Sequence, residues 1–139
     1  MELTKSKYKQ TEVGLIPEDW TLMKLEDIID QFRHIRYGVV QPGKYTQNGC
    51  LMLRSQDYSK GWKSIETMHR VNQVIESLYK GTKLKQGDLV ITIVGAGIAQ
   101  VVEVPKKIEG TLLSRSTARI AVNKEKAVSK LILHFFLSD

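Results

Sequence analysis

The stretch LVITIVGAGIAQVVEV, Leu89 to Val104, decides the kind of fold, because one apolar run enters Gly-Ala-Gly and a second leaves it. Two structures give such a pattern: a phosphate-binding loop between a strand and a helix, or a tight turn between two antiparallel strands. They differ in the residues that come after the glycines. A dinucleotide-binding loop needs a helix that starts directly after them and an acidic residue about 20 positions further on.

The residues after the glycines favour the turn. Gln100 stands where the fingerprint has its third glycine, and residues 101–105 (VVEVP) are rich in β-branched side chains, which are typical of strands. About 20 residues on, where the acid would stand, the chain reads SRS at 114–116. We therefore predict a hairpin in which the glycines supply positive φ, and no cofactor bound by this chain.

Outward from this hairpin, short strands alternate with turns. Apolar runs at 50–55 and 116–122 indicate further strands, with turns near Gly87-Asp88 and Glu109-Gly110. Helical spacing predicts short helices at 25–32 and 71–81 and a terminal helix at 124–139, with Asn123 as its N-cap. Residues 14–20 (GLIPEDW) indicate a loop entering the domain. The predicted fold class is α+β: a twisted, mainly antiparallel sheet with a few helices.

The length and net charge of the chain limit its possible domain organisation and partners. The chain has 139 residues, so we expect a flexible basic N-terminal arm at 1–13 and a single domain at 14–139. Net charge is +6, of which residues 61–139 carry +5, and a basic surplus favours a polyanionic partner. No run reaches the ~18 apolar residues of a membrane span. One cysteine, Cys50, cannot form an internal disulfide, which is typical of a cytoplasmic protein.

Motifs for catalysis are weak. The three histidines, at positions 34, 69 and 134, are scattered and have no ligand-spaced partners. VEVPK at 102–106 is loosely similar to nuclease strands that end in an acid and a lysine, but no well-placed second carboxylate supports a metal pair. A nucleic-acid-processing enzyme with its own metal site therefore stays an alternative rather than the preferred interpretation.

Four blocks in order carry a more specific resemblance. They are YKQTEVGLIPEDWTLMKLEDI (8–28), YTQNGCLMLRSQDYSKG (45–61), LKQGDLVITIVGAGIAQVVEVP (84–105) and LLSRSTARIAV (112–122). Together they resemble the N-terminal target recognition domain of type I restriction-modification specificity subunits, from about Tyr8 to Asp139.

The resemblance implies a DNA-binding subunit without catalytic activity. Such subunits carry two recognition domains, each reading one half of a split double-stranded DNA site, separated by long helical spacers that dock modification (methyltransferase) subunits. Restriction subunits complete the complex. S-adenosylmethionine, ATP and magnesium are expected on those partner subunits, and this chain is expected to direct methylation and cleavage in the cytoplasm without contact with a membrane.

The sequence departs from this family at its end, because the spacer and the second domain are missing. We therefore expect a truncated or partial chain. The terminal segment has apolar Val128, Leu131, Ile132, Phe135 and Phe136 in one stripe, with Leu133 and Leu137 beside it. We expect such an apolar face to pack against another protein surface. A homodimer of the truncated chain is one expectation, and a role limited to assembly with a modification subunit is a further alternative.

Candidate DNA-binding residues are those whose side chains pair with base edges or phosphates. The variable-looking loop 33–48 is preferred for base reading over the recurring RSQD at 54–57, where Arg54 can instead pair with Asp57. The predicted set is Arg33, Arg36, Tyr37, Lys44, Tyr45, Gln47, Arg54, Gln56, Lys60, Arg115 and Arg119.

Overall fold

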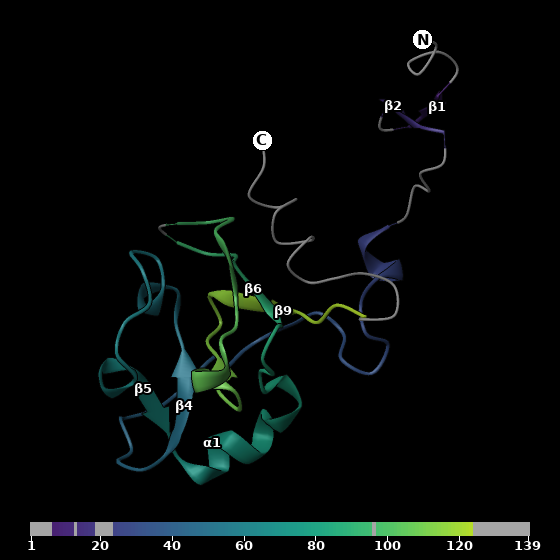
Figure 1. The fold of residues 1–139 in the computed structure, drawn as a ribbon. Helices are drawn as coiled ribbons and strands as arrows, with labels where there is room; N and C mark the ends of the chain where they lie inside the picture. Colours follow the sequence, from purple (N-terminus) through teal and green to yellow (C-terminus); the bar gives the residue numbers. More distant parts are fainter. Residues whose placement is uncertain (1–6, 13, 19–23, 96, 124–139) are drawn as a thin grey trace.

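A computed structural model describes residues 7–12, 14–18, 24–95 and 97–123 (Figure 1). Its larger sheet has four strands in the order β3 (Arg36–Tyr37), β9 (Thr117–Ile120), β6 (Leu89–Thr92) and β7 (Val101–Glu103), and every neighbouring pair is antiparallel. The prediction of a mainly antiparallel α+β fold is confirmed.

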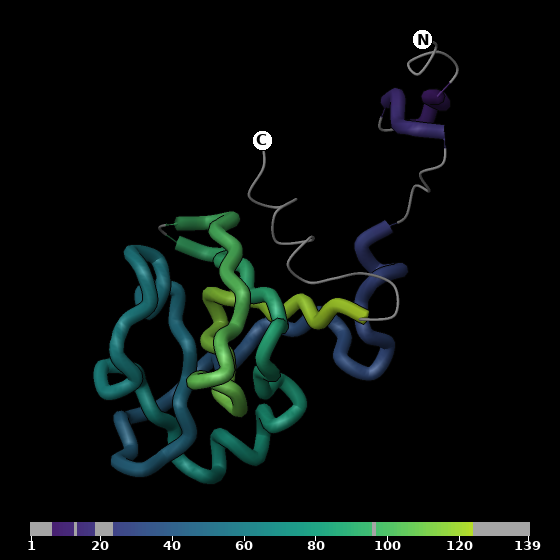
Figure 2. The backbone as a smooth tube through the Cα atoms, in the orientation of Figure 1, coloured from purple at the N-terminus to yellow at the C-terminus, as the bar shows by residue number. Residues whose placement is uncertain are grey.

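A second sheet contains the one parallel pair of strands found among the described residues. Its order is β5 (His69–Val71), β4 (Cys50–Leu53) and β8 (Leu112–Leu113), with β4 antiparallel to β5 and parallel to β8. The chain passes from β8 directly to β9 through the turn at 114–116, so the two sheets are joined at this corner (Figure 2).

The Gly-Ala-Gly segment joins β6 to β7 as a hairpin, as the sequence predicts. Val90 pairs with Val102 in the antiparallel register, and Gly95 and Gly97 have φ of 92° and 80°. A helix does not come after the glycines, which rules out a dinucleotide-binding loop at this position. The predicted turns at Gly87 and Gly110 are also present, each with positive φ.

Apolar side chains fill the space on both sides of the larger sheet. One cluster lies between the two sheets and contains Leu53, Tyr58, Met68, Leu84, Val90, Val104, Ile108 and Leu113. A second contains Ile29, Leu89, Val101, Ile120 and Val122. A third packs Val39, Met52, Val71 and Leu112 against Ile75 and Tyr79. Alternation along β6 explains the first two, since Leu89 and Val90 point to opposite faces.

The described helices are short. Helix α1 (Gln73–Leu78) begins where the Asn72 side chain accepts a hydrogen bond from the Ile75 N–H, within the segment 71–81 predicted to be helical. Single 3-10 turns complete the chain: η1 (Leu25–Asp27), η2 (Ser55–Asp57), η3 (Ile65–Thr67), η4 (Lys80–Thr82) and η5 (Lys106–Ile108).

The helix predicted at 25–32 is wrong beyond its first turn. After η1, Ile29 forms a β-bridge with Val122, Asp30 N–H donates to the Ala121 carbonyl, and Asn123 N–H donates to the Ile28 carbonyl. These bonds to the end of β9 replace the i to i−4 bonds of a helix. Phe32, which the helical pattern assigned to the core, is 94% exposed.

Near the N-terminus, β1 (Tyr8–Thr11) pairs with β2 (Gly14–Pro17) as an antiparallel hairpin. The segment predicted as a loop at 14–20 is therefore a strand over residues 14–17. The predicted terminal helix 124–139, including its apolar stripe and its capping by Asn123, lies outside the described residues. Within the described part of the chain, no helix has the length and apolar character needed to cross a membrane.

Candidate nucleic-acid interface

The parallel pairing of β4 with β8 brings two of the predicted arginines to the same edge. Met52 lies opposite Leu112 and Leu53 opposite Leu113, and both strands end there. The Ser114 N–H donates to the Leu53 carbonyl at 2.9 Å, which holds the two chain exits together. Neighbouring parallel strands end at the same edge of a sheet. Arg54, which follows β4, and Arg115, which follows β8, therefore both lie at this edge.

Arg115 stands at the corner of a tight turn. The backbone N–H of Thr117 and its side-chain hydroxyl both donate to the Ser114 carbonyl, at 3.2 and 3.0 Å, and the Ser114 and Ser116 hydroxyls are 2.9 Å apart. These bonds leave the Arg115 side chain exposed. A cation fixed at a turn corner in this way is free to contact a phosphate or a base.

The η2 turn supplies the other polar side chains at this edge. Asp57 is buried and accepts a hydrogen bond from the Arg54 N–H at 2.7 Å, and the Arg54 guanidinium lies 3.5 Å from its second oxygen. The suggested Arg54–Asp57 pairing is therefore present. Gln56 and Lys60 are exposed, and Arg54 is half-buried.

A buried hydrogen bond fixes η2 to the β6–β7 hairpin. The hydroxyls of Tyr58 and Thr92 are 2.6 Å apart, and both residues are buried. Burial raises the pKa of the Tyr58 hydroxyl, its bond with Thr92 acts in the opposite direction, and the nearby Asp57 carboxylate raises the pKa further. On the other side, Ile93 N–H donates to the Ser116 carbonyl at 2.8 Å, which fixes the Arg115 turn to the same hairpin.

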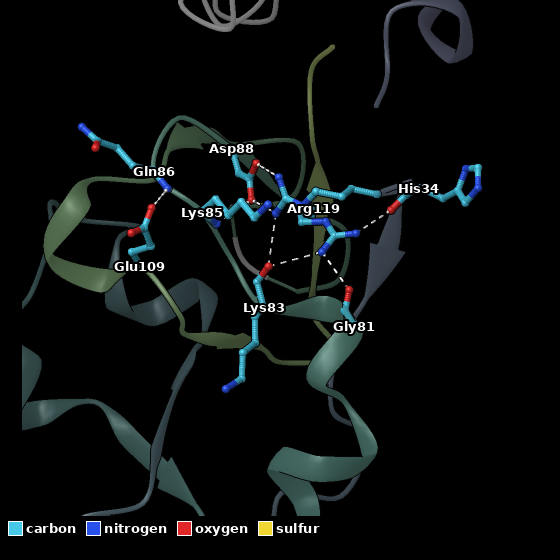
Figure 3. Close-up of polar contacts among 9 residues, drawn as sticks. His34, Gly81, Lys83, Lys85, Gln86, Asp88, Glu109 and Arg119 are labelled. Carbon is cyan, nitrogen blue, oxygen red and sulfur yellow. Dashed lines mark hydrogen bonds and ion pairs between the residues drawn. The ribbon is translucent and has the colours of Figure 1, made fainter. Parts of the chain in front are cut away.

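Two predicted arginines, Arg119 (Figure 3) and Arg33, instead belong to a structural network. Arg119 is 1% exposed and donates to the carbonyls of Gly81, Lys83 and His34 at 3.0 to 3.3 Å. Arg33 makes two bonds to the Asp88 carboxylate and one to the Lys83 carbonyl. Burial, followed by the charge of Arg33, lowers the pKa of Arg119.

The location of Arg119 corrects one part of the predicted set. A side chain this deeply buried presents no surface to DNA, so Arg119 is not a base or phosphate contact in this conformation. The alternating pattern along 116–122 gives no sign that carbonyls from η4 and residue 34 enclose the Arg119 guanidinium. Arg33 is half-buried and has both guanidinium Nη atoms engaged.

The rest of the set is spread along the loop 36–48. Arg36 and Tyr37 are exposed on β3, and Arg36 lies opposite Arg119 in the register. Lys44, Tyr45 and Gln47 are exposed in the loop before β4, which contacts β5: Thr46 N–H donates to the Arg70 carbonyl, and the Tyr45 and His69 rings meet edge to face. These residues therefore belong to a different part of the fold from the edge that carries Arg54 and Arg115.

The described part of the chain offers few side chains for metal binding or acid–base catalysis. No group of three or more His, Cys, Asp or Glu side chains there could hold a metal ion. His34 and His69 lie apart, on the segment before β3 and on β5, and His134 is outside the described residues. The buried carboxylates Asp57 and Asp88 are each bonded to an arginine of the same chain.

Sequence reasoning missed one feature of this edge, the exposed apolar tip of the β6–β7 hairpin. Val94 and Ile98 are 59% and 64% exposed, on either side of the glycines. This apolar tip could have been found in the sequence, since IVGAGIAQ at 93–100 has no charged residue. The predicted set contains only polar and aromatic residues.

Comparison with known proteins identifies relatives along nearly the whole chain. It is 35% identical, over 90% of its length, to the type I restriction enzyme EcoBI specificity subunit of Escherichia coli, and 27% identical, over 95%, to the MjaVIII specificity subunit of Methanocaldococcus jannaschii. The chain spans 26% and 31% of these relatives. No family model matches it. The resemblance to the recognition domain of specificity subunits is therefore confirmed.

Proposed function

We propose that this chain is a DNA target recognition module that reads one half of a split site within a type I restriction-modification complex. The observation that carries the proposal is that exposed Gln56, Lys60 and Arg115 follow the edge where β4, β6 and β8 end, with Arg54, paired with Asp57, at the same edge. Guanidinium and amide groups pair with the base edges of guanine and adenine, and the added cations suit phosphates. The relatedness to specificity subunits supports the same role.

In this role the chain binds and positions but does not catalyse. Methylation and cleavage would belong to modification and restriction subunits, with S-adenosylmethionine, ATP and magnesium held there, and the complex would work in the cytoplasm. Of the predicted contacts, the proposal keeps Arg36, Tyr37, Lys44, Tyr45 and Gln47 as a second group on the β3 side and places Arg33 in a supporting position. A nuclease with its own metal site gains no support from the described carboxylates and histidines.

The test is duplex binding as a function of salt. We expect weak binding with little sequence preference, since one module collects only part of the specificity that two would share, and a steep loss of affinity as salt rises. Arg115→Gln should lower the slope of log affinity against log salt by about one, as expected when one phosphate contact is lost. Fluorescence anisotropy of a labelled duplex measures both quantities.

The matched control is Lys107→Gln. Lys107 is exposed on η5, beyond the end of β7 that is remote from the hairpin tip, so the variant removes the same charge from another surface. An unchanged slope is expected for it. The proposal fails if the wild-type chain does not bind a duplex at low salt, or if the two variants change the slope equally. Magnesium-dependent cleavage by the purified chain would also contradict it.

A further inference from the structure

Hydrogen bonds join the described residues on the two sides of the β6–β7 hairpin tip, 92–95 and 97–100. Ala99 N–H donates to the Thr92 carbonyl at 2.7 Å, Ile98 N–H to Gly95 at 3.2 Å and Gln100 N–H to Gly97 at 3.0 Å. Gly95, Gly97 and Ala99 all have positive φ. Successive turns of this kind close the two-stranded ribbon, and a left-handed conformation at the non-glycine residue Ala99 is uncommon enough to suggest a functional constraint.

The side chains that this backbone presents are apolar. Ile93, Val94 and Ile98 are 37%, 59% and 64% exposed. The hairpin extends past the ends of the sheet strands (Figure 1). A projecting ribbon end without a charged side chain is unfavourable in water, and such surfaces commonly mark a binding site.

Arg115 and the η2 turn lie beside the base of this apolar tip. Arg115 is fixed beside it through the bond from Ile93 to Ser116, and η2, with Arg54 and Gln56, is fixed beside it through the bond between Tyr58 and Thr92. An apolar centre with a cationic rim matches duplex DNA, whose base edges carry methyl groups while the flanking backbones carry negative charge. An apolar protein surface would match the centre but would offer no anionic partner to the exposed Arg115.

We infer that the tip of the β6–β7 hairpin enters the major groove and that Val94 and Ile98 pack against thymine methyl groups, with Arg115 on a flanking phosphate or base. The inference rests on the proposed DNA-binding function and specifies how part of it is achieved. A two-stranded ribbon fits the width of the major groove, and aliphatic side chains, which lack hydrogen-bonding groups, distinguish thymine through its C5 methyl group.

The decisive probe is DNA in which uracil replaces thymine, because this change removes only the C5 methyl group. One duplex rich in A·T pairs is prepared in both forms, so that the test does not depend on a preferred sequence. Wild type should bind the uracil form several-fold more weakly, since each methyl group buried in an apolar contact is worth roughly a fourfold change in affinity. The variant Val94→Ser/Ile98→Ser should bind the two forms equally.

The matched control is Val74→Ser/Leu78→Ser on α1, where the two apolar side chains are 68% and 72% exposed. It should keep the wild-type preference for thymine. All four positions are exposed, so we expect folded variants, and thermal unfolding followed by circular dichroism checks this for each.

The outcomes distinguish an error in the DNA-binding function from an error in the contact assigned to the tip. If wild type binds neither duplex, the DNA-binding function itself is wrong and the inference falls with it. If wild type binds both forms equally, or if the tip variant keeps the thymine preference, only the assignment of the tip is overturned. Loss of a co-expressed modification subunit from the tip variant, with thymine preference retained, would assign the tip to a protein contact instead.

Discussion

At the scale of single residues, the most informative side chain is a buried arginine that, among the described residues, is bonded to backbone carbonyls and to no carboxylate. Arg119 holds three carbonyls that belong to different segments: His34 before β3, Gly81 in η4, and Lys83 after it. Backbone carbonyls in a buried place need donors, and a guanidinium offers five in a fixed plane. Arg119 therefore links β9 to the segment that leads into the exposed Arg36 and Tyr37.

We predict that Arg119→Met lowers the free energy of unfolding by about 2–3 kcal/mol, because the carbonyls that lose their donor remain buried. Arg119→Lys should recover only part of this, since one ammonium cannot reach all three acceptors. Urea denaturation at neutral pH measures the difference. Arg115→Gln, at an exposed turn, serves as the control and should have little effect. A Met variant as stable as wild type would show that the carbonyls find other partners.

Tyr58 provides a pH-dependent test at the same scale. Its folded pKa is raised above the ordinary value of 10.0, chiefly by burial. The neutral hydroxyl therefore contributes stability that is complete below pH 10 and is lost as the pH rises through the folded pKa, because the unfolded chain ionises first. Tyr58→Phe should be less stable than wild type at pH 8 but should lose less stability between pH 10 and 11. Parallel curves for the two proteins would contradict this assignment.

At the scale of elements, Gly38 is where the chain crosses β8. A Cβ added there would stand 1.9 Å from the Leu113 carbonyl oxygen, and the next residue, Val39, donates its N–H to that same oxygen. The glycine has no side chain, and this permits the close approach of the two backbones. β3 and the loop 39–48 reach their places through this crossing.

We expect Gly38→Ala to destabilise the fold by about 2 kcal/mol or more, because backbone rather than a flexible side chain must move. The control is Gly81→Ala, where an added Cβ meets nothing within 4 Å and φ is not positive. That change should be neutral. Thermal unfolding of both variants makes the comparison, and equal effects would rule out the crossing as the cause.

Some of these elements could be predicted from the sequence and others could not. Local chemistry predicted the hairpin at Gly95 and Gly97 and a helix within residues 71–81, because turns and short helices depend on neighbouring residues. It failed at 25–32, where helical spacing of Leu25, Ile29 and Phe32 suggested a helix but backbone bonds to residues 121–123, just after β9, decide the structure. The parallel pairing of β4 with β8, which creates the candidate interface, has no local signal, and neither does the burial of Arg119.

At the scale of the whole molecule, self-association remains a prediction from sequence. Its apolar stripe lies at 128–137, outside the described residues. Exposed apolar area on a helix favours a partner, and a two-fold dimer is the commonest closed arrangement. We expect light scattering over a concentration series to detect a dimer of this chain, and Leu133→Lys/Leu137→Lys to weaken it. A monomer throughout the series, or a dimer that the double change leaves intact, would refute the prediction.

The pairing of β4 with β8 also has a consequence for how the molecule folds. Met52 and Leu112 can meet only after a long loop closes, and such closure costs entropy before its contacts form. We therefore expect Arg54 and Arg115 to come together only at a late stage of folding, after β8 has paired with β4. Refolding should restore the local Gly95–Gly97 hairpin earlier than nucleic-acid affinity, and affinity should appear together with native β4–β8 pairing.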